Sequence, residues 1–64
     1  MDIVDGLQTE MDRCRKLIKT YNEIPTGAFG AAMIKAEIKN AESAIANGDI
    51  VKMIYCYKSL EECK

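Results

Sequence analysis

The chain has 64 residues, of which 9 are basic and 10 acidic, for a formal net charge of −1. This length limits it to one domain, over residues 1–64, and the near-neutral charge argues against bulk nucleic acid as a partner. A domain of this size buries only about 60% of its unfolded surface, so we expect association with further copies to stabilise it.

The cysteine content points to a reducing compartment and away from a metal site. The chain has three cysteines, no histidine and no CxxC pair, which excludes the usual zinc spacings. Cys14, Cys56 and Cys63 are each expected to be a buried, inert thiol. The N-terminal sequence has no signal peptide pattern, and no stretch approaches about 20 apolar residues. We therefore expect a cytoplasmic protein without a membrane span, a metal or a cofactor.

Residues 2–22 are expected to form the first helix, because apolar side chains recur there at intervals of three and four residues. This stripe consists of Val4, Leu7, Met11, Cys14, Ile18 and Tyr21, widened by Ile3 and Leu17. Asp2 is the expected N-cap, and Pro25 should end the helix by Asn22 or Glu23. Three heptads also predict contact between copies of the chain. The residues of that predicted interface are Val4, Leu7, Met11 and Ile18.

A second helix is expected over residues 27–46, with Thr26 as its N-cap. Its apolar stripe comprises Phe29, Ile34, Ile38, Ala41 and Ile45. Gly48 should then take the left-handed position that closes this helix, and Asp49 should cap the next one. The third helix is expected over residues 50–62. Its predicted inward residues are Ile50, Met53, Ile54, Tyr57 and Leu60.

The predicted fold is therefore all-α: a long N-terminal helix followed by an antiparallel αα-hairpin, assembled as a helical homo-oligomer. Tyr55 and Tyr57 point in different directions on the third helix, so both cannot lie in the core. Tyr55 is expected either to be exposed or to lie at an interface between copies, where an amphipathic ring is useful.

The stretch IPTGAFG, residues 24–30, holds the only Pro, the only Phe and two of the four Gly of the chain. Two glycines in the first turns of a helix cost roughly 1 kcal/mol each relative to Ala, so either ligand access or tight packing must explain them. Ligand access predicts a phosphate site, because a helix N-terminus presents unpaired N–H groups and a partial positive charge. Tight packing predicts a capped helix start, with Phe29 in the core and Gly30 making room for the first helix.

The predicted ligand site combines this turn with aromatic side chains for stacking and basic side chains for charge. Its residues are Arg13, Lys19, Tyr21, Thr26, Gly27, Phe29, Gly30 and Lys35. The basic residues of the first helix have a competing interpretation as the solvated face of an amphipathic helix. Because the chain has no His and no pairing of a nucleophile with a base, we expect no enzymatic activity and no catalytic residue.

The turn IPTGAFGAAMI and the hairpin AIANGDIVKMI, in a very short all-α chain, resemble the small orphan proteins carried by phages and prophages. Within that group, the size, the helical architecture and the Gly/Thr/aromatic turn are similar to those of the anti-defence sponges. Those small oligomers sequester cyclic dinucleotides or ADP-ribose-derived immune signals and do no chemistry on them. The resemblance implies a homo-oligomer in the bacterial host cytoplasm that binds a phosphorylated nucleotide.

Two further functions stay open on the sequence. The stripe of the first helix could dock in a groove of a host protein, which predicts a regulator or inhibitor that needs no small ligand. A DNA-binding accessory role is the least favoured, because the charge is nearly balanced and no recognition helix is evident.

Overall fold

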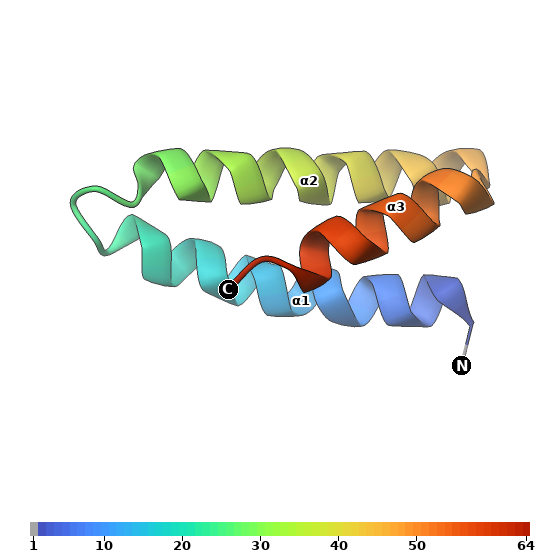
Figure 1. The fold of residues 1–64 in the computed structure, drawn as a ribbon, viewed down its shortest axis with the longest axis horizontal. Coiled ribbons are helices and arrows are strands. Elements are labelled where there is room, and N and C mark those ends of the chain that lie inside the picture. The colour runs from blue at the N-terminus through green and yellow to red at the C-terminus, as the bar shows by residue number, and fades with distance from the viewer. Residues whose placement is uncertain (1) are drawn as a thin grey trace.

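The computed structural model describes residues 2–64, which form three α-helices and no strand (Figure 1). α1 spans Ile3–Asn22, α2 spans Ala28–Asn47 and α3 spans Ile50–Glu61. The all-α fold is confirmed, and each helix begins and ends within one residue of its expected position. None of these helices is both long enough and apolar enough to cross a membrane.

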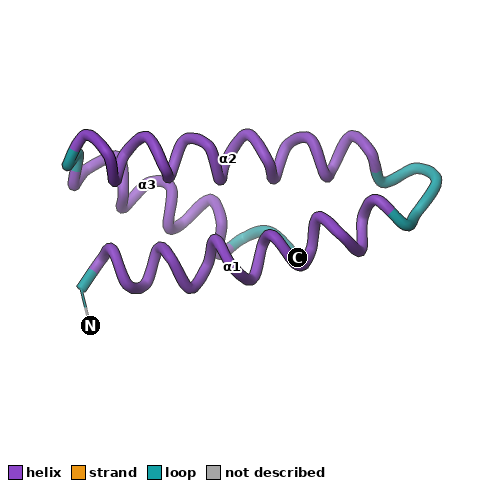
Figure 2. The backbone as a smooth tube through the Cα atoms, turned by 180° about the vertical axis from the view of Figure 1, so that it is seen from behind, coloured by secondary structure: helices purple, strands orange, loops and turns teal. Residues whose placement is uncertain are grey.

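α1 and α2 form a long antiparallel pair, and the shorter α3 runs obliquely along it (Figures 1 and 2). α3 has 12 residues against 20 in each of the other helices, so it covers only the half of the pair next to the α2–α3 turn. The C-terminus lies against the middle of α1 in both views. The result is an elongated domain with principal extents of 37 × 19 × 16 Å.

The ends of α1 follow local sequence signals. The Asp2 carboxylate accepts a hydrogen bond of 2.9 Å from the Asp5 N–H, which confirms Asp2 as the N-cap. α1 ends at Asn22, as predicted, because Pro25 disfavours helical geometry in the residue before it.

The start of α2 differs from the prediction. Gly27 occupies the N-cap position, and the exposed Thr26 lies one residue outside it. The turn is closed by the backbone instead, because the Gly27 N–H donates to the Ile24 carbonyl oxygen at 2.9 Å. Thr26 is therefore not the cap.

The α2–α3 turn has the predicted geometry. Gly48 adopts a left-handed conformation, with φ of 64°. The N–H groups of Gly48 and Asp49 donate to carbonyl oxygens of the last turn of α2, at 3.2 and 3.0 Å. The Asp49 carboxylate accepts a bond of 3.1 Å from the Lys52 N–H and so caps α3.

One apolar core joins the three helices. Its buried residues are Leu7, Met11, Cys14, Ala31, Ile34, Ile38, Ala41, Ala44, Met53, Cys56 and Leu60. The stripe of α1 thus faces the other helices of its own chain. Leu7 and Met11 are at most 1% exposed, so they have no surface left for a second copy, and their assignment to an oligomer interface is wrong. Val4 and Ile18 are half-buried at the edge of this core.

Three large apolar side chains expected to point inward are exposed. Phe29 is 76% exposed because it lies roughly 160° around α2 from the buried Ala31. Ile50 and Ile54 are about half exposed. The inward face of α3 is set by Met53, Cys56 and Leu60, and Ile50 and Ile54 fall to one side of it.

Candidate functional site

The two glycines of the α1–α2 turn are required by packing. A Cβ atom at Gly27 would overlap the backbone carbonyl group of Tyr21, with the carbonyl carbon only 2.8 Å away. A Cβ atom at Gly30 would lie 2.8 and 2.9 Å from two ring carbons of Tyr21. Gly27 therefore lets the start of α2 approach the last turn of α1, and Gly30 leaves the space that the Tyr21 ring occupies.

This packing accounts for the glycines that suggested a phosphate site. Tyr21 is half-buried above Gly30, and its hydroxyl donates to the Lys64 carbonyl oxygen, so its ring holds the C-terminal residues against α1. Thr26 and Phe29 are both exposed at the turn. Gly30 makes room for α1, as the packing interpretation predicted, but Phe29 is outside the core.

Arg13 contacts the C-terminal end of α3, next to the residue that the Tyr21 hydroxyl contacts. Its guanidinium donates to the carbonyl oxygens of Cys63 at 2.8 Å and Leu60 at 2.6 Å, and to the Glu10 carboxylate at 3.2 Å. The hydrogen bond to Glu10 raises the pKa of Arg13. A cation at the last carbonyls of a helix satisfies acceptors that the helix itself leaves unpaired. Arg13 therefore holds the end of α3 against α1, which gives it a structural role, and its predicted ligand contact stays a prediction.

The other basic residues of α1 do gather on one surface. Asp12, Arg15, Lys16 and Lys19 line an open hollow of about 440 Å³. Arg15 is engaged there, because it forms ion pairs with Asp12 at 2.8 Å and with Glu42 at 3.8 Å. Among residues 2–64, no carboxylate lies within ion-pair distance of Lys16 or Lys19. These two lysines are the charges that this hollow leaves available.

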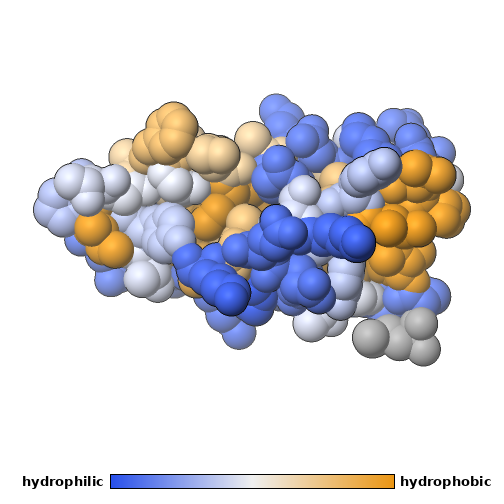
Figure 3. Space-filling model, viewed as in Figure 1, coloured by the Kyte–Doolittle hydropathy of each residue, from blue (hydrophilic) through white to orange (hydrophobic). Residues whose placement is uncertain are grey.

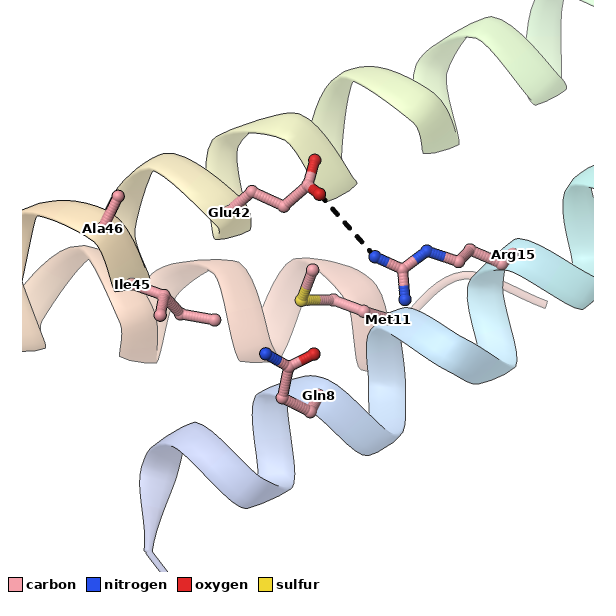
Figure 4. A pocket seen from close by; sticks show the side chains of 6 residues that line it. All are labelled: Gln8, Met11, Arg15, Glu42, Ile45 and Ala46. Atoms are coloured by element: carbon pink, nitrogen blue, oxygen red, sulfur yellow. Dashed lines mark ion pairs between the residues drawn. The ribbon is translucent and has the colours of Figure 1, made fainter.

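A second hollow of about 330 Å³ lies between α1 and α2 (Figure 4). It is lined by Gln8, Met11, Arg15, Glu42, Ile45 and Ala46. The Arg15–Glu42 ion pair spans one side of it, and the Gln8 amide lies below Met11 and Ile45. Its polar groups can donate and accept hydrogen bonds, but none of them is placed to act as a nucleophile with an adjacent base.

The cysteines lie mainly in the interior. Cys14 and Cys56 are buried free thiols, and burial raises the pKa of both above the ordinary value. The Cys14 thiol donates to the Leu60 carbonyl oxygen at 3.5 Å. Because the thiolate is the reactive form, these two side chains are poor nucleophiles near neutral pH, as expected. Cys63 is half-buried and donates to the Ser59 carbonyl oxygen at 3.4 Å.

Two exposed apolar surfaces were not predicted as such, although Phe29 was expected at the ligand site and Tyr55 was expected either to be exposed or to lie at an interface. The first, here called the α2 outer patch, consists of Phe29, Ala32, Met33 and Ala36. The second, here called the α3 outer patch, consists of Ile50, Val51, Ile54 and Tyr55. Both are visible in Figure 3, as apolar surface over the start of α2 and over the start of α3. The signal was present in the sequence, because each helix carries apolar residues at helical spacing on two opposite sides.

Comparison of the chain with protein-family models, with curated protein sequences and with solved structures gives no significant match.

Proposed function

We propose that the protein is a non-enzymatic binding protein that regulates another protein by contact, with the α2 outer patch as its docking surface. The observation that carries the proposal is the exposure of Phe29, at 76%, beside Met33, at 57%, one helical turn further on. Aromatic and Met side chains are enriched in protein interfaces, and Met adapts to partners of different shape.

The spacing of the patch matches a known mode of recognition. Its four residues occupy positions i, i+3, i+4 and i+7 of α2, the positions that an amphipathic helix inserts into an apolar groove. Further along the same outer side, α2 presents Asn40, Ser43 and Asn47. The apolar character is thus confined to the first half of the helix, which gives the docking surface a defined extent.

This proposal keeps the protein-binding regulator considered from the sequence but moves its docking surface. The stripe of α1 packs inside the chain, so α1 cannot offer it to a partner without unfolding. The outer side of α2 is accessible in the folded monomer.

Affinity capture with a photo-crosslinker tests the proposal. We would place the crosslinking residue at position 29 and, as a matched control on the same face, at position 40. We expect one protein to crosslink at position 29 but not at position 40. Once that protein is purified, Phe29→Asp with Met33→Asp should weaken its binding by at least about tenfold, whereas Asn40→Asp with Ser43→Asp should change it little. Equal binding by the two double variants, or no crosslinked protein, would contradict the proposal.

A second candidate is sequestration of a phosphorylated nucleotide, such as a cyclic dinucleotide or an ADP-ribose derivative. It is favoured by the hollow where Lys16 and Lys19 have no paired carboxylate. Native mass spectrometry with a mixture of such nucleotides tests this candidate. We expect an adduct that disappears in Lys16→Ala with Lys19→Ala and persists in Lys39→Ala, a matched exposed lysine on α2. Absence of any adduct with the wild-type protein would exclude it.

A further inference from the structure

We propose that Cys14 and Cys63 are a redox-sensitive pair, which a low-molecular-weight disulfide converts into an intramolecular disulfide bond between α1 and the end of α3. Cys14 lies in the middle of α1, and Cys63 follows the last residue of α3 by two positions. The α2 outer patch contains neither cysteine, so the inference does not depend on the proposed function.

The two cysteines meet at one backbone atom. The Leu60 carbonyl oxygen accepts from the Cys14 thiol at 3.5 Å and from the Cys63 N–H at 3.1 Å. The Cys63 thiol donates to the adjacent carbonyl oxygen, that of Ser59, at 3.4 Å. The Cys63 side chain also packs against the core cluster that contains Cys14. This shared acceptor is compatible with the Cα separation of at most about 7 Å that a disulfide requires.

Arg13 holds the two cysteines together and places a positive charge beside them. Its guanidinium donates to the carbonyl oxygens of Leu60 and Cys63, which keeps the segment with Cys63 on α1. Burial raises the pKa of the Cys14 thiol most, the Arg13 charge lowers it, and the Cys63 thiol raises it further. A neutral thiol has such an effect only on a close neighbour, and the nearby cation favours the Cys14 thiolate.

Exposure determines the order in which the two thiols react. Cys63 is half-buried and reachable by a small oxidant, whereas Cys14 is 0% exposed. Cys63 loses its proton to water, and its thiolate attacks one sulfur of the small disulfide. The S–S bond of the oxidant breaks, one small thiolate leaves, and a mixed disulfide remains at Cys63.

Cys14 completes the reaction from inside the protein. It loses its proton, and its thiolate attacks the Cys63 sulfur, which forms the protein disulfide and releases the second small thiolate. Two protein thiols are thus oxidised, and one small disulfide is reduced to two thiols that regain the two protons. This second attack is intramolecular, and the resulting proximity offsets the raised pKa of Cys14.

The third cysteine lies outside the pair. Cys56 is 5% exposed, and its pKa is raised first by burial and then by Glu37 of α2. Neither of the other thiols contributes to that change. Cys56 is also separated from Cys63 by about 10 Å along the helix direction. It therefore serves as a matched control within the same chain.

Incubation of the full chain with oxidised glutathione tests the pair. Trypsin, which cleaves after Lys and Arg, places the three cysteines in three separate peptides. We expect a mass loss of about 2 Da, for two hydrogens, and a link between the peptides of Cys14 and Cys63 that dithiothreitol reverses. The oxidised protein should melt about 10 °C or more above the reduced protein, because the bond closes a long loop in the unfolded chain.

Three variants assign the roles of the cysteines. Cys63→Ser changes a half-buried side chain and should gain neither the bond nor the rise in melting temperature. Cys14→Ala should stop at the glutathione mixed disulfide on Cys63, whereas Cys56→Ala should form the bond as wild type does. A wild-type protein that keeps its free thiols, or that carries only glutathione adducts, would overturn the inference. So would a bond to Cys56, or a melting temperature that oxidation leaves unchanged.

Discussion

The two connections of this molecule both depend on glycine, but for different physical reasons. At the α2–α3 turn, Gly48 is needed for its backbone angle: its φ is 64°, and a Cβ atom there would meet nothing within 4 Å. At the α1–α2 turn, Gly27 and Gly30 have no positive φ, and a Cβ atom at either would collide with Tyr21. Gly48 is thus required by the local backbone conformation, whereas Gly27 and Gly30 are required by the close packing of α1 against α2.

This difference explains why the glycines of the α1–α2 turn were ambiguous in the sequence. A glycine that gives a ligand access to the backbone and a glycine that makes room for a neighbouring helix have the same cost in helix propensity. Only the position of Tyr21 distinguishes them, and that position depends on how α1 and α2 pack. Substitutions at these three glycines separate the requirement for a backbone conformation from the requirement for close packing.

Gly27→Ala should have the largest effect. The added methyl group meets the backbone carbonyl of Tyr21, and backbone cannot rotate away as a side chain can. We expect a loss of at least about 3 kcal/mol in the free energy of unfolding, a large share of the stability of so small a domain. Urea denaturation followed by circular dichroism measures it. A loss under about 1 kcal/mol would show that the turn yields and that packing does not require this glycine.

Gly30→Ala should cost less, about 1–2 kcal/mol, because the obstacle is the Tyr21 ring, which can tilt. The two residues should also be coupled. In a double-mutant cycle with Tyr21→Ala, the added methyl group at position 30 should be nearly neutral once the ring is gone. Strict additivity of the two effects would show that the ring is not the reason for glycine at position 30.

Gly48→Ala should cost about 1 kcal/mol, entirely through the left-handed backbone conformation, since the space around it is open. Gly48→Asn is the matched variant, because Asn tolerates this conformation better than Ala does. The expected order of stability is therefore glycine, asparagine, alanine. Equal stability of the two variants would indicate that the turn relaxes out of the left-handed region.

Structural features that depend on neighbouring residues were predicted correctly from the sequence, whereas side-chain orientations that depend on packing between helices were not. Helix positions, the Asp2 and Asp49 caps and the Gly48 turn all follow from residues within a few positions of one another. The orientation of Phe29, Ile50 and Ile54 does not, because α2 and α3 carry apolar residues on two sides and periodicity cannot say which side is covered.

The structural role of Arg13, one of the predicted ligand residues, was not evident from the sequence for the same reason. Arginine is well suited to bind phosphate, and only the packing of α3 against α1 shows that Arg13 donates to the Leu60 and Cys63 carbonyl oxygens. Lys16 and Lys19 remain available on α1, but no sequence signal separated them from Arg13.

The smallest effects distinguish a cap that exists from one that was only predicted. Asp49→Ala removes the acceptor of the Lys52 N–H and should cost about 1 kcal/mol. Thr26→Ala should stay within about 0.5 kcal/mol of wild type, because Thr26 is exposed and the N-cap position of α2 belongs to Gly27. Chemical denaturation of both variants gives the two values side by side. A cost at Thr26 as large as that at Asp49 would mean that the Thr26 hydroxyl caps α2 in solution, and that this turn, like the α2–α3 turn, is governed by local chemistry.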